Sequence, residues 1–173
     1  MFFDMQQPPE HSSIRPDAVP EPVLVSACLL GRACTYEGGD NRDMALEAEL
    51  ARDGCEPVPF CPEESGGLPT PRPAANLTAP SADVLDGEGR VVSIHGDDVT
   101  SAFLAGAEAA LERCRARGIR RAFLKERSPS CGCAATHLES GLVPGRGVTA
   151  ELLERSGVRC EGGEGRRPAP ETA

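Results

Sequence analysis

Apolar residues along the chain gather in short runs that are separated by amphipathic stretches. Three of these runs contain β-branched or aromatic residues, which favours buried strands: PVLVSA (22–27), EPVPF (56–60) and IRRAFLK (119–125). VRC, residues 158–160, is a candidate for a last short strand. The pattern therefore predicts short strands of the kind that helices cover in the interior of a domain.

The clearest amphipathic stretch is DDVTSAFLAGAEAALERCRARG, residues 97–118. Its apolar residues from Val99 to Cys114 recur at spacings of three and four, which puts them on one face of a helix. Either of the two leading aspartates can cap the start of this helix, and Gly118 can end it. The sequence therefore predicts one long helix between the second and third strands.

Two further helices are predicted from their capping residues. Asn41 can cap a helix over residues 42–52, which Gly54 would end, and Thr149 can cap a helix that runs to about Ser156. Each of these helices lies between two of the predicted strands.

Strands and helices thus alternate, and ADVLDGEGRVVSI (82–94) is predicted to add a hairpin with Asp-Gly and Glu-Gly at its tip. This order predicts an α/β fold, a single domain with a mostly parallel sheet flanked by helices and a small β-hairpin. The domain is expected to span residues 21–160. Residues 1–20 and 161–173 are rich in proline, glycine or charge and lack periodicity, so both are predicted to be mobile tails.

Composition and charge narrow the possible functions. The 173 residues suffice for one domain with a core, and the net charge of −9 speaks against binding of extended nucleic acid, which needs a basic surface. No apolar run reaches the roughly 18 residues of a membrane span, and the first residues, MFFDMQQPPE, lack the features of a signal peptide. We therefore expect no membrane association and a cytoplasmic location. There, the eight cysteines would serve as thiols, metal ligands or catalysts rather than as disulfides.

Three of the cysteines follow predicted strands. Cys28 comes after the first strand, Cys61 after the second, and Cys131 lies in the loop after the third. Because ligands collect at the carboxyl ends of parallel strands, we expect these thiols on one rim of the sheet. Three thiolates are a soft ligand set for zinc or an iron–sulfur cluster. Their spacing matches neither zinc ribbons nor ferredoxins, and suits a cluster with three protein-held irons and one open iron.

The other cysteines have less specific interpretations. Cys114 falls on the apolar face of the long helix and is expected to be a small buried hydrophobe. Cys55 and Cys160 are interpreted as structural or incidental. Cys34 and Cys133 each lie near a candidate ligand, so each can either replace that ligand or remain a free thiol beside it.

Acid–base groups accompany the thiols. Glu63 lies two residues after Cys61, and Ser128 and Ser130 precede Cys131. A carboxylate and a hydroxyl beside an open metal position are the components of general acid–base catalysis. The alternative for Glu63 is a solvated or capping residue, and the alternative for Ser128 is a turn former in its Ser-Pro pair.

Nearby charged residues are assigned less functional weight. Lys125 and Glu126 are expected to form an ion pair at a strand end. Lys125, Arg72 and Arg32 can supply local positive charge for an anionic group, but a solvated surface position is favoured for each. The proline-rich loop ESGGLPTPRPAANL (64–77) is either a rigid wall over the rim of cysteines or a surface loop without function.

Several of these motifs together resemble a known family. VSACLLGRACTYEGG, FCPEESGGLPTPRP, LKERSPSCG and LVPGRGVTAELLERSGV resemble, in order and spacing, a widespread bacterial group that includes the thiouracil desulfidases. The resemblance covers about residues 22–160. The chain departs from it at residues 35–38, where Thr-Tyr-Glu-Gly stands in place of the frequent Arg-Tyr-Asp-Gly.

The resemblance implies a 4Fe–4S cluster held by three cysteines. It also implies removal of sulfur from 2-thiouracil-like bases without net redox change. By position in the motifs, the cluster ligands would be Cys28, Cys61 and Cys131, and the catalytic residues would be Glu63 and Ser128.

Two functions from different classes are therefore kept, with sulfur handling in the metabolism of thiolated tRNA as a third alternative. The first is a desulfidase that converts a small-molecule thiolated base or nucleotide to its oxo form with release of hydrosulfide. The second is a non-catalytic structural or sulfur-carrier module that binds a metal or cluster, whose signature would be a fourth ligand such as Cys34 or Cys133.

Overall fold

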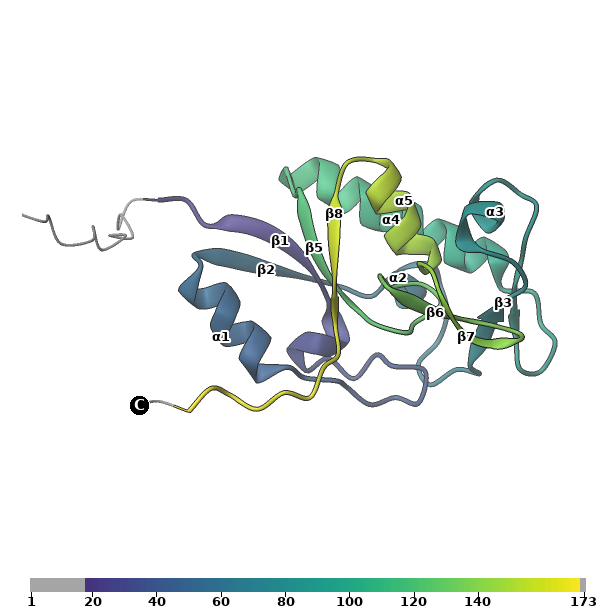
Figure 1. The fold of residues 1–173 in the computed structure, drawn as a ribbon, viewed down its shortest axis with the longest axis horizontal. Coiled ribbons are helices and arrows are strands. Elements are labelled where there is room, and N and C mark those ends of the chain that lie inside the picture. The colour runs from purple at the N-terminus through teal and green to yellow at the C-terminus, as the bar shows by residue number, and fades with distance from the viewer. Residues whose placement is uncertain (1–17, 172–173) are drawn as a thin grey trace, which may run out of the picture.

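The computed structural model describes residues 18–171 of the chain (Figure 1). Most of the predicted N-terminal tail, residues 1–17, lies outside the described residues. Two four-stranded sheets and five α-helices make up the described part.

The larger sheet is entirely parallel, with strand order β2-β1-β5-β8. This confirms the predicted mostly parallel sheet. The three strands predicted first and the short C-terminal one are all present, with their bounds shifted by one to three residues. They are β1 (Glu21–Ser26), β2 (Cys55–Phe60), β5 (Arg121–Lys125) and β8 (Arg159–Gly163).

Helices cover both faces of this sheet, as Figure 1 shows. The alternation of β1 explains the arrangement, since successive side chains of a strand point to opposite faces. Val23 and Val25 pack with residues of the first helix, whereas Leu24 packs with residues of the long helix and the last helix. These helices are α1 (Met44–Arg52), α4 (Thr100–Arg117) and α5 (Val148–Arg155).

A second, smaller sheet was not predicted from the sequence. Its order is β4-β3-β6-β7, with β3 parallel to β6 and the two outer pairs antiparallel. It packs on α4 and α5 through a separate apolar cluster that includes Leu77, Val91, Phe103 and Val148. Its strands are β3 (Ala75–Leu77), β4 (Val91–Ser93), β6 (Ala135–Leu138) and β7 (Gly141–Pro144).

The hairpin predicted for residues 82–94 is wrong. The first half of this stretch forms the short helix α3 (Ser81–Leu85), and only the second half forms a strand, β4, which pairs with β3. The buried residues of α3 are Ser81 and Val84, and their spacing of three fits a helix rather than a strand exposed on one side. The chain does contain a small hairpin, but it is built from β6 and β7.

The helix boundaries show which capping residues the chain uses. Asp43, not Asn41, caps α1, because its carboxylate accepts the backbone N–H of Leu46 at 2.9 Å. Gly118 ends α4 in a left-handed conformation, as predicted. The last helix begins at Val148, so Thr149 lies inside it rather than at its cap.

The C-terminal segment is attached to the domain beyond the predicted boundary. Strand β8 continues to Gly163, so the boundary at residue 160 falls inside the strand. Further along, Arg167 Nε donates to the carboxylate of Asp43, and the Arg167 carbonyl accepts the N–H of Met44 at 3.0 Å. The segment therefore lies against the start of α1, as the yellow trace in Figure 1 shows.

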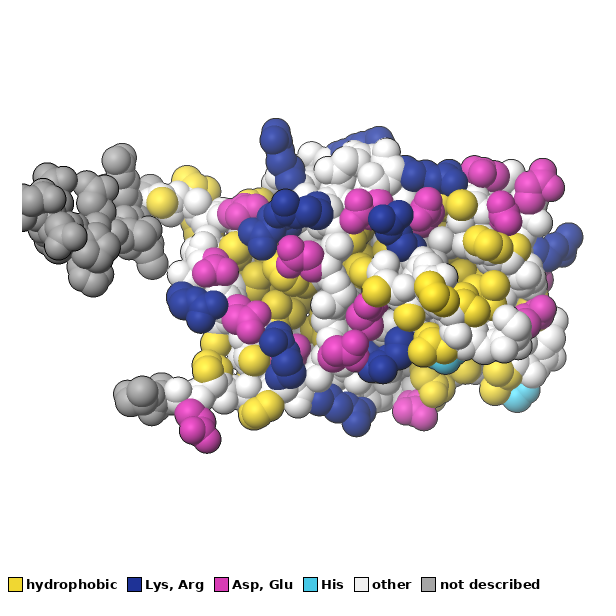
Figure 2. Space-filling model, in the orientation of Figure 1, with side chains coloured by type: hydrophobic (Ala, Val, Ile, Leu, Met, Phe, Trp, Pro, Cys, Tyr) yellow, Lys and Arg dark blue, Asp and Glu magenta, His cyan; other side chains and the backbone are white. Residues whose placement is uncertain are grey.

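Charged side chains of both signs are interspersed over the face shown in Figure 2. Among the ion pairs of the described residues are Arg117 with Glu56 and Arg155 with Asp86, each at 3.0 Å. Within residues 18–171, no helix combines the length and the hydropathy that crossing a bilayer requires.

Candidate active site

The three predicted thiols reach one cavity from three strands. Strand β1 leads into the 3-10 helix η1 (Ala27–Leu30), which carries Cys28. Cys61 directly follows β2 and stands at the start of the short helix α2 (Pro62–Ser65). Cys131 lies in the loop after β5. All three line a cavity of about 410 Å³, which is within the usual size range of small-molecule sites.

The predicted acid–base residues line the same cavity. Glu63 and Ser128 are both part of its wall, so the structure brings together the five residues singled out from the sequence. Other polar residues also belong to this wall. They include Cys34, Arg72, Lys125, Ser130, His137 and Arg166.

Cys34 lies beside two of the predicted ligands. Its sulfur lies within 4.8 Å of the Cys61 sulfur, and its thiol also interacts with that of Cys28. These contacts lower the pKa of Cys28 and lower the pKa of Cys61 to about 7, while they raise the pKa of Cys34. Cys28 and Cys61 are therefore more acidic than an ordinary cysteine, and Cys34 is less acidic. The contact from the Cys61 thiol to the Cys34 carbonyl is long, 3.9 Å, and needs the protonated form of Cys61.

Cys131 has a different environment. Burial raises the pKa of the Cys131 thiol to about 12, and hydrogen bonds from Ser26 and Ser130 oppose this effect only in part. The Ser130 hydroxyl lies 3.6 Å from the Cys131 sulfur. A cation beside Cys131 would favour its thiolate, since a coordinating thiol loses its proton.

Glu63 is held by an arginine and a serine. Arg72 Nε donates to Glu63 Oε2 at 2.6 Å, and the Ser130 hydroxyl donates to Glu63 Oε1 at 3.0 Å. The side chains of Glu63 and Arg72 are only 13% and 6% exposed. The prediction of Arg72 as a solvated surface residue is therefore wrong. Arg72 turns inward because its other nitrogens donate to the carbonyls of Cys34 and Pro69.

Ser128 shapes the turn that carries Cys131. Its hydroxyl oxygen accepts the backbone N–H groups of Ser130 and Cys131 at 3.2 and 3.1 Å, which is the turn-forming role considered for it. It also lies 3.0 Å from the Ser130 hydroxyl. Ser128 therefore connects to Glu63 through Ser130 rather than directly, and Ser130 is the serine in contact with the carboxylate.

The ion pair expected between Lys125 and Glu126 does not form. Lys125 Nζ instead donates to the backbone carbonyl of Glu126 at 3.1 Å. The Glu126 carboxylate instead accepts hydrogen bonds from the backbone N–H groups of Cys133 and Ala134. The lysine side chain is thus left at the wall of the cavity.

The remaining cysteines lie outside the wall of the cavity. Cys114 is buried in the core, as predicted. Cys133 is not part of the cavity wall, and its thiol contacts that of Cys160. Cys55 packs among the apolar residues beneath α1. All eight cysteines lie within the described residues, and all are free thiols.

Two glycines fix the position of the helix that carries Glu63. A Cβ added at Gly106 of α4 would lie 2.0 Å from the carbonyl oxygen of Pro62, and one added at Gly66 would lie 2.0 Å from that of Ala102. The backbones of α2 and α4 therefore touch, which sets the distance between α2 and the core.

The sequence favoured a surface position for Arg72, and it placed Ser130 and Cys34 near the site without identifying their contacts. The available signal for Arg72 was its place among three prolines, since a stiff loop holds a side chain in one direction. For Ser130 and Cys34 the signal was only proximity to Cys131 and Cys28, which does not tell which side chains face one another.

The chain is similar to proteins of one family. Residues 23–163 match the family model described as 2-thiouracil desulfurase. The uncharacterized protein YbbK of Bacillus subtilis (strain 168) is 36% identical over 141 residues, which cover 79% of this chain and 92% of that protein. A solved structure of the 4Fe–4S-dependent thiouracil desulfidase TudS (DUF523Vcz) is 41% identical with a TM-score of 0.70, covering 82% of this chain and 90% of that one. The chain belongs to the 2-thiouracil desulfurase family.

Proposed function

We propose that this chain is an iron–sulfur-dependent desulfidase that converts a thiolated nucleobase of the 2-thiouracil type to its oxo form and releases hydrosulfide. Membership of the family and the likeness to TudS support the reaction and the 4Fe–4S cofactor. The observation that carries the proposal is that Cys28, Cys61 and Cys131 share one cavity with the buried pair of Glu63 and Arg72.

The thiols fit such a cluster. They come from three distant segments, and Cys28 lies near enough to both Cys61 and Cys131 for their charges to interact. Thiolates are the usual ligands of iron–sulfur clusters. The buried thiol of Cys131 would give up its proton only beside a cation, which the irons provide. Cys28, Cys61 and Cys131 would therefore hold the cluster, which when bound supplies a Lewis acid that attracts a thione sulfur.

Glu63 would act as the general base. Arg72 engages its Oε2, which leaves Oε1 toward Ser130 and the cavity. Oε1 would take one proton from a water molecule while the water oxygen bonds to the carbon that bears the sulfur. The carbon–sulfur bond then breaks, and sulfur leaves as hydrosulfide. The reaction adds one water and removes one hydrogen sulfide, so neither an oxidant nor a reductant is needed.

Ser128 and Ser130 would carry the proton onward. The Ser130 hydroxyl donates to Glu63 Oε1, and it lies 3.0 Å from the Ser128 hydroxyl. A proton taken by Glu63 can pass along these hydroxyls to the substrate. Ser128, as a member of the cavity wall, would also hold the substrate in place.

The substrate would be a small-molecule thiolated base or nucleotide. Lys125 and Arg166 line the cavity and would provide positive charge for an anionic group such as a phosphate. The limited size of the cavity, about 410 Å³, suits a monomeric substrate rather than extended nucleic acid.

A non-catalytic cluster-binding module is the second candidate, and one observation favours it. Cys34 contacts both Cys28 and Cys61, so a fourth thiol stands where it can close a metal site. A closed site with four cysteines would leave no position for a substrate. Turnover by the loaded protein separates the two candidates.

The test is anaerobic reconstitution with iron and sulfide, followed by a hydrosulfide assay with 2-thiouracil, 4-thiouracil and their nucleotides. We expect hydrosulfide and the oxo product in equal amounts with at least one of these compounds. Protein with a full cluster that releases hydrosulfide from none of them would overturn the proposed activity and favour the non-catalytic module.

A further inference from the structure

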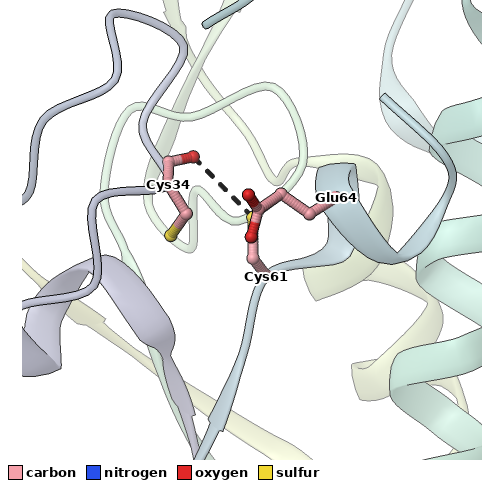
Figure 3. Close-up of side chains that lie close together, drawn as sticks. All are labelled: Cys34, Cys61 and Glu64. Atoms are coloured by element: carbon pink, nitrogen blue, oxygen red, sulfur yellow. Dashed lines mark hydrogen bonds between the residues drawn. The ribbon is translucent and has the colours of Figure 1, made fainter. Parts of the chain in front are cut away.

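Cys34, Cys61 and Glu64 gather at one side of the cavity, as Figure 3 shows. Each offers a ligand atom, and the three atoms all lie within 4.8 Å of one another. The loop after η1 supplies Cys34, while Cys61 and Glu64 stand at the start of α2. Figure 3 shows the Glu64 side chain reaching from α2 back over the Cys61 sulfur toward Cys34. Two sulfurs and one carboxylate oxygen are thus gathered by segments far apart in the sequence.

One oxygen of Glu64 lacks a hydrogen-bond partner. Glu64 Oε1 is buried and accepts no hydrogen bond. The nearest cation is Arg32, whose Nη2 lies 3.5 Å away on a side chain that is 61% exposed, so this contact is a weak ion pair. A buried carboxylate oxygen without a donor is unfavourable, because it has lost its hydration. A bound cation would replace that hydration.

The other oxygen of Glu64 is fixed in place. Thr70 donates from its hydroxyl to Glu64 Oε2 at 2.8 Å. Arg72, which also contacts the Thr70 hydroxyl, donates to the carbonyl of Cys34 at 2.9 Å. Such outer contacts orient metal ligands in known sites. The proline-rich loop therefore holds both Glu64 and Cys34 while leaving Oε1 free.

We propose that Cys34, Cys61 and Glu64 bind one Zn²⁺ in the chain that lacks its cluster. Tetrahedral zinc, with Zn–S of about 2.3 Å and Zn–O of about 2.0 Å, places its ligand atoms about 3.5–3.8 Å apart. The three atoms within 4.8 Å need only a small contraction to meet this geometry. Three protein ligands leave the fourth position for water, as in other three-ligand zinc sites.

This site has a consequence for the cofactor. Cys61 belongs both to the zinc site and to the proposed cluster site, so one thiolate cannot serve both. Each thiol that binds zinc gives its proton to solvent. Zinc and the cluster therefore exclude one another, and zinc protects the thiols of the cluster-free chain while it blocks cluster assembly.

The first experiment titrates the cluster-free, full-length protein with Zn²⁺ under anaerobic conditions, in competition with a chromogenic chelator. We expect one tightly bound zinc per chain. Glu64→Gln and Cys34→Ser should each weaken its binding about tenfold or more, because each removes one ligand. Cys133→Ser, which changes a half-buried thiol outside the cavity wall, should bind zinc as the unchanged chain does. Absence of tight zinc binding to the unchanged chain would overturn the proposal. So would zinc binding by Glu64→Gln and Cys34→Ser that is as tight as that of the unchanged chain.

The second experiment adds one equivalent of Zn²⁺ before reconstitution and measures iron and acid-labile sulfide. In the unchanged chain, zinc should reduce the uptake of both. Glu64→Gln keeps Cys28, Cys61 and Cys131, so it should take up iron and sulfide despite the zinc. Equal inhibition of the variant and the unchanged chain would overturn the mutual exclusion. The zinc titration requires no turnover, so a failure of the proposed desulfidase activity leaves its result unaffected.

Discussion

Arg72 Nε donates to Glu63 Oε2 at 2.6 Å in a pair that is almost closed to solvent. The two residues belong to α2 and to the proline-rich loop, and their contact joins these segments across the wall of the cavity. Arg72 also holds the Cys34 carbonyl, so one guanidinium connects the proposed base with the segment that follows Cys28. Positioning of the base therefore depends on a residue of the proline-rich loop, which lies outside the strands that precede Cys28 and Cys61.

Replacement of Glu63 by glutamine should remove most of the turnover but leave the cluster in place. A positioned general base contributes a factor of about 10²–10⁴ in rate, and glutamine keeps the shape of the side chain. Hydrosulfide release and visible absorbance of the reconstituted variant test both parts. Glu56→Gln is a matched control, because Glu56 lies exposed on β2 and pairs with Arg117 away from the cavity. Full turnover by the Glu63 variant would rule out its role as the base.

Arg72→Met should lower the free energy of unfolding by about 3–5 kcal/mol, because it leaves the Glu63 carboxylate buried without its partner. Urea unfolding of the cluster-free protein measures this change. Arg32→Met is the matched control. Its side chain is 61% exposed, so the effect should stay within about 0.5 kcal/mol. Similar losses of unfolding free energy in the two variants would show that the buried pair of Arg72 and Glu63 stabilises the fold no more than an exposed ion pair does.

Gly106→Ala should displace α2 from α4. The new Cβ would lie 2.0 Å from the Pro62 carbonyl oxygen, which is backbone and cannot rotate away. We expect a loss of about 1–3 kcal/mol in unfolding free energy, together with lower iron uptake, since Cys61 precedes Pro62. Glu108→Ala, at an exposed position of the same helix, controls for the substitution. Unchanged stability and iron content in the Gly106 variant would mean that α2 is not fixed by this contact.

Arg167→Ala should destabilise the start of α1. Asp43 is fully buried and caps this helix, and Arg167 supplies its positive partner from beyond the residues that match the family model. Loss of that partner should cost about 1–3 kcal/mol in unfolding free energy. Arg52→Ala, which removes a 71% exposed arginine paired with Asp53, should have little effect. Equal stability of both variants would show that the C-terminal segment does not support the helix.

The convergence of the three thiols could be predicted because it follows from topology. Cys28 and Cys61 directly follow adjacent parallel strands, and parallel strands end at the same edge. The long helix could be predicted because its apolar spacing extends over many turns. The second sheet could not, since its strands have only three or four residues and β3 pairs with β6, about sixty residues further along the chain.

Finer details of the site depend on contacts that no local pattern encodes. Asp-Gly and Glu-Gly suggested a hairpin, but the same glycines can follow a short helix, as they do after α3. Glu63 and Glu64 are adjacent identical residues, yet α2 directs one to Arg72 and the other to the sulfurs of Cys34 and Cys61, where the zinc site is proposed. The side chains of successive helical residues point about 100° apart. The different directions of Glu63 and Glu64 could therefore be predicted only with knowledge of where α2 begins.

The iron and acid-labile sulfide content of single cysteine variants after anaerobic reconstitution tests the proposed cluster ligands most directly. We expect full content in the unchanged chain, in Cys34→Ser and in Cys133→Ser. We expect loss of the cluster in Cys28→Ala, Cys61→Ala and Cys131→Ala. A complete cluster in any of these three alanine variants would contradict the assignment of that thiol as a ligand.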